Sequence, residues 1–223
     1  MIPRLHVYLI AAMILAGFLI SAAAYPHLPN PVPVHWNMHG QADRYGSPLV
    51  NILAIPIISV VLAVVCGLLP KFGPMKANFE QFSKIYGRMI VALLAMLLCM
   101  HVVILLKSAG HPVAIERVFP VMIGVLLAIL GNWMGKIRRN FYVGIRTPWT
   151  LANDLVWERT HRVGGHLMVA IGLLAALAAL VPHPLAGFAV LIGGVLLFTV
   201  WALIYSCRLY QKVGHADEAG GSH

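Results

Sequence analysis

The sequence predicts an all-α integral membrane protein with six transmembrane helices and both termini in the cytoplasm. Its 223 residues are 60% hydrophobic and only 10% charged, whereas soluble domains are about 45–50% apolar and about 25% charged. The mean hydropathy is +0.84. Apolar segments near the ~20 residues that cross a bilayer recur along the chain, and the cations are unevenly shared between the connectors. A large soluble domain does not fit in the remaining length.

Six apolar segments are the expected membrane spans. The first contains Arg4, an apolar run and small residues before Tyr25, as a signal peptide would. Its apolar run is longer than the 7–15 residues typical of such a peptide, so we expect a retained helix. The expected spans cover about residues 5–24, 49–69, 89–106, 118–134, 166–181 and 185–205.

Charge sets the predicted orientation. If the six spans are correct, one face of the membrane carries just three of the sixteen Lys and Arg, namely Arg44, Lys107 and Arg117. The other thirteen lie near the termini, in the connector 70–88 and in the connector 135–165. The positive-inside rule places these four regions in the cytoplasm. The same rule accounts for the net charge of +9 without any direct binding of nucleic acid, and no cofactor is expected.

The predicted organisation has four parts. An N-terminal unit of two helices carries a proline-rich outer loop over residues 25–48, and a linking region holds the third span. A region with spans four to six follows, and a polar cytoplasmic tail ends the chain. The expected boundaries are 1–69, 70–116, 117–208 and 209–223.

The outer loop contains a candidate metal site. His35, His39 and Asp43 are spaced four apart, so a short helix opened by Pro33 would place all three on one side. Two histidines and a carboxylate can hold Zn²⁺ with an open position. The alternative is a structural polar cluster, which is favoured because Gly40 would interrupt such a helix and no glutamate adjoins His35.

The longest polar interruption, residues 131–165, predicts a folded cytoplasmic segment. The basic run 136–139 lies at the headgroup level, and Asn140 and Gly144 suit tight turns. Thr147 and Pro148 predict the start of a helix. We expect an amphipathic helix over about 148–162 in the membrane interface, with an i,i+4 pair between Glu158 and Arg162 and an end at Gly164-Gly165.

Two motifs resemble a known family. The segment GNWMGKIRRNFYVGIRTPWTL, followed by VWERTHRVGG, resembles the signature of the SdpI family of bacterial membrane proteins. The outer segment YPHLPNPVPVHWNMHGQAD is similar to the small domain of unknown function that often precedes it. The cytoplasmic resemblance falls on Asn132, Gly135, Arg138, Asn140, Gly144, Arg146, Thr147, Pro148, Trp149, Trp157, Thr160, His161, Arg162 and Gly165. The outer resemblance falls on Pro29, Pro33, His35, Trp36, Asn37, Gly40 and Asp43.

The resemblance implies a bacterial inner-membrane protein that gives resistance to a secreted antimicrobial peptide toxin. It also implies signalling, in which the toxin-engaged protein holds a DNA-binding autorepressor at the membrane. Two alternatives remain. A membrane hydrolase could use the outer His/Asp cluster, or Arg146, Asp154 and His161 in the cytoplasm. The second alternative is a small transporter. Ion-coupled transporters usually need charged residues inside their spans, whereas His101 is the one ionisable residue near mid-depth of the expected spans.

Overall fold

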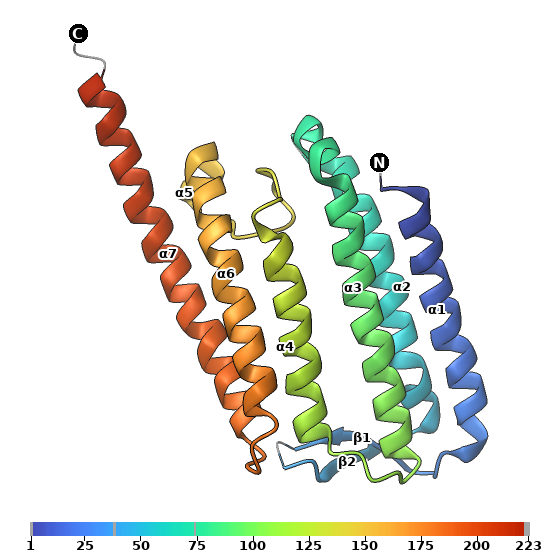
Figure 1. Ribbon diagram of the computed structural model, residues 1–223. Helices are drawn as coiled ribbons and strands as arrows, with labels where there is room; N and C mark the ends of the chain where they lie inside the picture. The colour runs from blue at the N-terminus through green and yellow to red at the C-terminus, as the bar shows by residue number, and fades with distance from the viewer. Residues whose placement is uncertain (1, 38, 74, 221–223) are drawn as a thin grey trace.

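Long apolar helices dominate the computed structural model, which describes residues 2–37, 39–73 and 75–220, with side chains as far as 213 (Figure 1). Within this part of the chain, six helices are long and apolar enough to span a membrane, which confirms the predicted fold class. The elements in order are α1 (Arg4–Ala24), η1 (Tyr25–His27), β1 (Val32–Trp36), β2 (Ala42–Gly46), α2 (Pro48–Phe72), α3 (Lys76–Ser108), α4 (Ile115–Met134), α5 (Pro148–Ala152), α6 (Asp154–Ala178) and α7 (Ala186–Gly220).

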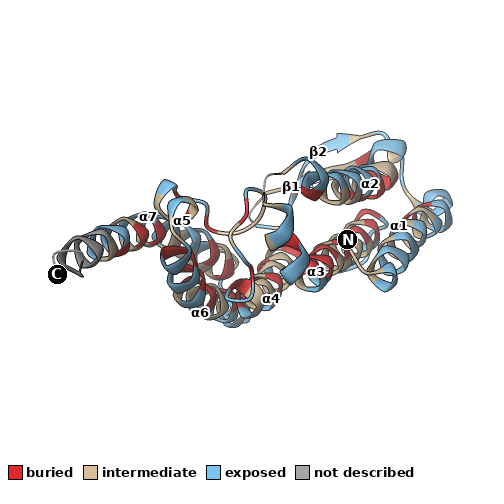
Figure 2. Cartoon of the chain, turned by 90° about the horizontal axis from the view of Figure 1, so that it is seen from above, coloured by how far each residue is buried: buried red, intermediate tan, exposed pale blue. Residues whose placement is uncertain are grey.

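The long helices form two groups of three. Helices α1, α2 and α3 contact one another, as do α4, α6 and α7, and α3 packs beside α4 to join the groups (Figure 2). Both termini lie at the end of the bundle that carries α5, and the strands lie at the opposite end (Figure 1). We call these the basic end and the hairpin end, because Arg44, Lys107 and Arg117 belong to elements at the hairpin end and the other cations to the basic end.

The closest packing is between α4 and α6, where backbones touch at two glycine pairs. A Cβ added to Gly165 would lie 2.5 Å from the Gly131 carbonyl oxygen, and one added to Gly172 would overlap the Gly124 carbonyl oxygen. Small residues let membrane helices approach this closely. Gly164-Gly165 was expected to end an interfacial helix. That expectation is wrong, because both glycines lie inside α6.

The predicted amphipathic helix over 148–162 is also wrong. Helix α5 ends at Ala152, and Asn153 adopts an extended conformation with φ −142°. The Asn153 side chain then accepts hydrogen bonds from the Leu155 and Val156 amides and so begins α6, which continues without a break to Ala178. Trp157, expected to lie in the membrane interface, is 1% exposed. The helix that contains the fifth span therefore starts at Asp154.

Most of the expected connector 70–88 is helical. Helix α3 begins at Lys76 and runs for 33 residues, which includes the polar stretch that hydropathy alone had excluded from the third span. The buried face of this first part repeats at helical spacing, with Phe79, Phe82, Tyr86, Met89 and Ile90 in the core. It packs against Met134, Ile137 and Trp157, so the main buried cluster lies at the basic end, next to the segment 135–153.

The outer loop forms a β-hairpin, so the short helix on which the metal alternative depended is absent. Strands β1 and β2 are antiparallel, with Pro33 opposite Tyr45 and Trp36 opposite Ala42. Prolines are tolerated here because both strands of a two-stranded sheet are edges. The turn is closed by Asn37, whose Oδ1 accepts from the amides of His39 and Gln41, and by Gly40 at φ +73°.

Candidate binding surfaces at the two ends of the bundle

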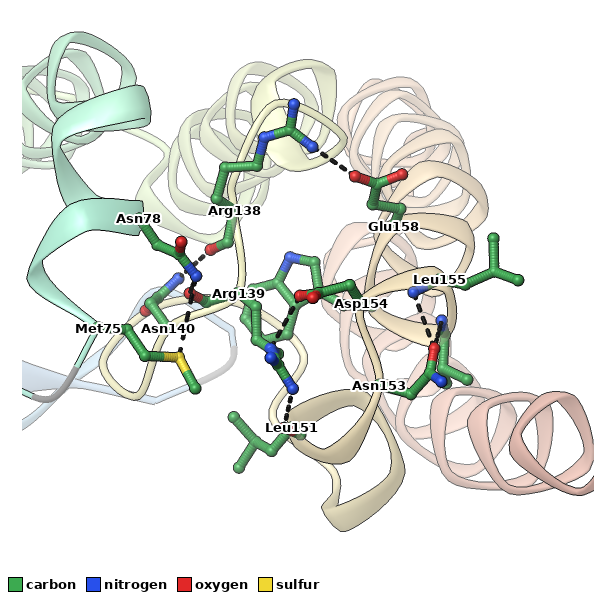
Figure 3. Close-up of polar contacts among 12 residues, drawn as sticks. Met75, Asn78, Arg138, Arg139, Asn140, Leu151, Asn153, Asp154, Leu155 and Glu158 are labelled. Atoms are coloured by element: carbon green, nitrogen blue, oxygen red, sulfur yellow. Dashed lines mark hydrogen bonds and ion pairs between the residues drawn. The ribbon is translucent and has the colours of Figure 1, made fainter. Parts of the chain in front are cut away.

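At the basic end, residues 135–147 form an ordered loop built around Asn140. Its side chain is fully buried, and its Oδ1 accepts hydrogen bonds from the amides of Tyr142 and Val143 at 2.9 and 2.8 Å. Its Nδ2 donates to the Arg138 carbonyl at 2.8 Å. Asn78 of α3 donates to the Arg139 carbonyl at 3.0 Å (Figure 3). One asparagine therefore shapes the turn, and a second joins it to the other helical group.

Tyr142 extends the same junction. Its ring stacks on Phe82 with centroids 6.4 Å apart and meets Phe79 and Tyr86 edge to face. Burial raises the pKa of the Tyr142 hydroxyl to about 12. The aromatic contacts place the loop against α3, as Asn78 does.

His161 of α6 supports the second half of the loop. The imidazole is fully buried and stacks on Trp157 with ring centroids 3.9 Å apart. Nε2 accepts from the Ile145 amide at 2.9 Å, and Nδ1 donates to the Trp157 carbonyl at 2.8 Å. Gly144 has φ +112°, and a Cβ there would overlap His161 Nε2. Glycine is required at position 144 because the loop backbone passes directly over the His161 ring.

Both nitrogens of His161 are thus engaged in holding the backbone, which leaves neither free for acid–base chemistry. The cytoplasmic catalytic group considered above also does not assemble. Asp154 pairs with Arg139, whose Nε lies 2.8 Å from Asp154 Oδ1 and whose Nη1 donates to the Leu151 carbonyl (Figure 3). Arg146 donates to the Phe141 carbonyl.

Helix α5 is fixed by hydroxyl groups. Thr147 caps it as predicted, and Thr147 and Thr150 form a reciprocal capping box. Thr147 Oγ1 also donates to Ser206 of α7 at 2.9 Å. Pro148 occupies the first turn and Trp149 is half-buried. These contacts attach the short helix to α7.

Glu158 makes a different ion pair from the one predicted. It pairs with Arg138 of the loop and not with Arg162 one turn along α6 (Figure 3). Both partners are about half exposed, so the pair contributes little to stability. The indole Nε1 of Trp157 meanwhile donates to the Ile137 carbonyl at 2.7 Å. The loop therefore contacts α6 through residues 137 and 138, and spacing within one helix could not predict these contacts.

Asn132, a signature residue at the end of α4, is exposed.

At the hairpin end, the three candidate metal ligands of the less favoured alternative are not brought together as a set. His35 Nδ1 lies 2.6 Å from Asp43 Oδ1 across the two strands, while the His39 amide belongs to the turn. Among the described residues, no group of three or more His, Cys, Asp or Glu could hold a metal ion. The one-sided arrangement of His35, His39 and Asp43 depended on a helix that does not form.

The hairpin is tied to the helices through the Pro33 carbonyl. This oxygen accepts from Asn51 Nδ2 at 2.9 Å and from Ser108 Oγ at 3.3 Å. Asn51 also donates to Ser108 at 3.0 Å. Sequence reasoning missed both residues, although a buried asparagine and serine at the ends of apolar segments are a usable signal because buried polar groups need partners.

A pocket of about 290 Å³ lies beneath the hairpin. Its walls include Trp36 from β1, Ile104 from α3, Phe119 from α4 and Phe188 from α7. Glu116 supplies the one carboxylate among the lining residues, and it reaches the hairpin turn, since a Cβ on Gly40 would overlap its Oε2. The pocket is mainly apolar and aromatic, bears one negative charge and touches both helical groups.

Comparisons with known proteins match two segments of this chain. The model of the SdpI/YfhL protein family matches residues 136–206, and that of a domain of unknown function (DUF1648) matches residues 12–60. Residues 136–206 therefore match the SdpI/YfhL family, and residues 12–60 match the second domain. The resemblance inferred from the two motifs is therefore confirmed. The SdpI/YfhL match begins in the loop of Asn140 and ends at Ser206, and the second match includes the whole hairpin.

One relative of the SdpI/YfhL family matches over most of its length. The chain is 27% identical over 197 residues to the immunity protein SdpI of Bacillus subtilis (strain 168), which covers 88% of this chain and 92% of the relative. No solved structure matches. The family match thus rests on sequence, and the geometry of the pocket and the loop comes from this chain alone.

Proposed function

We propose that this protein sits in the inner membrane of a bacterium and protects the cell from a secreted antimicrobial peptide toxin. The observation that carries the proposal is the similarity to an immunity protein over nearly the whole of both chains. The asymmetry of Lys and Arg supports an orientation with the basic end in the cytoplasm and the hairpin outside. The proposal includes no catalytic step, cofactor or nucleic-acid contact.

The pocket beneath the hairpin is the proposed toxin site. Aromatic walls favour an apolar side chain, and Glu116 favours a neighbouring cation such as lysine or a peptide amine. Because α3 and α4 both line the pocket, a bound peptide would contact the two helical groups at once. This position supports a mechanism in which toxin binding changes the packing between the two helical groups.

Replacing Glu116 by glutamine tests this site. Removing a charge that pairs with a cation costs about 1.5–3 kcal/mol, so the toxin concentration that kills half the cells should fall about 10-fold or more, toward that of cells without the gene. Survival curves under toxin challenge, with membrane levels checked by immunoblot, give the measurement. Glu80→Gln, an exposed acid at the basic end, should protect like the unchanged protein.

Two results would count against the proposal at different levels. Equal survival of cells with and without the gene across candidate toxins removes the immunity function. Full protection by Glu116→Gln leaves the function in place and removes the pocket as its site.

The folded loop at the basic end is the proposed dock for a cytoplasmic autorepressor. Phe141 is 43% exposed there, beside exposed Arg146, which donates to the Phe141 carbonyl. An exposed aromatic next to a cation is a common composition for a protein contact. Asn140, His161 and Thr150 hold this surface in one shape, so little order must be gained on binding.

An Arg146→Ala variant should separate protection from signalling. Expression from the repressor's own promoter, measured with a reporter during toxin exposure, should lose most of its induction, while membrane levels stay unchanged because one of thirteen cytoplasmic cations is lost. Arg88→Ala, also exposed at the basic end, should induce normally. A host with no repressor gene beside this one, or normal induction in Arg146→Ala, argues against the dock.

A further inference from the structure

A groove lined by cations lies at the basic end, where α4 stops and the loop turns toward α6. Its volume is about 630 Å³. Its lining includes Lys136 and Arg138 from the loop, Arg159 and Arg162 from α6, and Gln81 from α3. Four cations therefore face one space, supplied by segments that are distant in sequence.

The charges of this groove are not balanced from within. Glu158 is the one carboxylate among the lining residues, and it pairs with Arg138. Lys136, Arg159 and Arg162 are exposed and form no ion pair with any described residue. Three like charges in a shared groove repel one another, and an anion placed among them relieves that repulsion.

The position of the groove indicates which anion. It begins at Gly135, directly after the apolar helix α4 ends at Met134, which is the depth where lipid headgroups start. Leu155, 41% exposed, lines the same groove, so a polar interior borders an apolar edge. Basic pockets between membrane helices on the cytoplasmic side bind phosphate-bearing lipid headgroups. Arginine also matches phosphate geometry with two parallel hydrogen bonds.

We propose that this groove binds the phosphate of an anionic phospholipid headgroup. Arg159 and Arg162 hold the phosphate from α6, and Lys136 approaches it from the loop. The lipid thereby bridges the loop to α6. A free phosphate ion has the same recognition chemistry, so the test must distinguish the two sources.

The test uses the full chain purified in detergent and mixed with phosphatidylglycerol or phosphatidylcholine, with bound lipid counted by native mass spectrometry. Phosphatidylglycerol should bind about 10-fold more tightly than phosphatidylcholine. The double variant Arg159→Gln/Arg162→Gln should lose about 10-fold in phosphatidylglycerol affinity. The matched control Lys84→Gln/Arg88→Gln removes the same charge from exposed positions of α3 that do not line the groove, and it should bind like the unchanged protein.

Several results would overturn the proposal. These are equal binding of the two lipids, unchanged affinity in Arg159→Gln/Arg162→Gln, and an equal loss in both double variants, which would mean general charge attraction. Inorganic phosphate that displaces phosphatidylglycerol at matching concentrations would assign the groove to a free anion instead. Thermal melting of each variant shows whether lost binding reflects lost folding, and Lys136→Gln then serves as the second groove variant.

Discussion

Gly172→Ala is expected to lower the thermal stability of the purified protein by roughly 6–12 °C, or about 3 kcal/mol. The new Cβ would overlap the Gly124 carbonyl oxygen and lie 2.9 Å from the Ala128 amide nitrogen. Both are backbone atoms of α4, so no side chain can rotate away. The two helices must separate, and separation sacrifices the tightest packing in the molecule. Alanine's higher helix propensity, about 1 kcal/mol, offsets only part of this loss.

Gly193→Ala is the matched control. It lies in α7, and a Cβ there meets nothing within 4 Å, so the same substitution should leave the melting temperature unchanged or slightly raised. Gly165→Ala should behave like Gly172→Ala, because its Cβ would lie 2.5 Å from the Gly131 carbonyl oxygen. Melting is followed by size-exclusion chromatography of heated detergent samples. Similar melting temperatures for Gly172→Ala and Gly193→Ala would contradict the close crossing.

The glycine crossing also shows how far sequence reasoning could reach. Hydropathy located the apolar core of every span because a membrane span is a local property of composition. The small residues were visible too, but which helices they join was not. Gly172 lies in the predicted fifth span, and its spacing does not show that it contacts α4. Helix pairing depends on contacts between distant segments, and one sequence carries no direct record of them.

The candidate sites divide in the same way. Local signals predicted the Thr147 cap and the turn at Gly144, and the structure confirms both. The break at Asn153 was missed, although an asparagine before an acidic first turn is a capping signal. The hairpin was not predicted because it depends on pairing between two strands. Its anchor was not predicted because it depends on Asn51 of α2 and Ser108 of α3. Glu116 became a site residue only when the hairpin was placed over it.

Long-range contacts hold the loop in one shape, so this polar segment can present a defined binding surface. Trp157 reaches the Ile137 carbonyl, Asn78 reaches Arg139, and Thr147 reaches Ser206. Each contact ties the loop to a different helix, so movement between the two helical groups would be transmitted to it. The pocket beneath the hairpin spans the same junction at the opposite end. Under the proposed function, a change of packing between α3 and α4 would therefore reach both ends.

His161→Phe should loosen this loop without unfolding the protein. Phenylalanine retains a ring against Trp157 but leaves the buried Ile145 amide without its acceptor, which costs about 1–3 kcal/mol. The cost falls on the loop because the helices around it keep their own contacts. Amide hydrogen exchange over residues 138–150, measured by mass spectrometry, should accelerate about 10- to 100-fold, while exchange in α3 and α4 stays as it was.

His161→Ala should exceed this effect, since it also removes the ring and leaves a cavity beside Trp157. The control is His166→Ala, at an exposed position of the same helix, which should leave exchange unchanged. Unaltered exchange over 138–150 in His161→Phe would show that the Ile145 hydrogen bond does not hold the loop. If the loop loosens as expected, His161→Phe should also lose repressor induction. It should retain protection, because the proposed toxin site lies at the opposite end of the bundle.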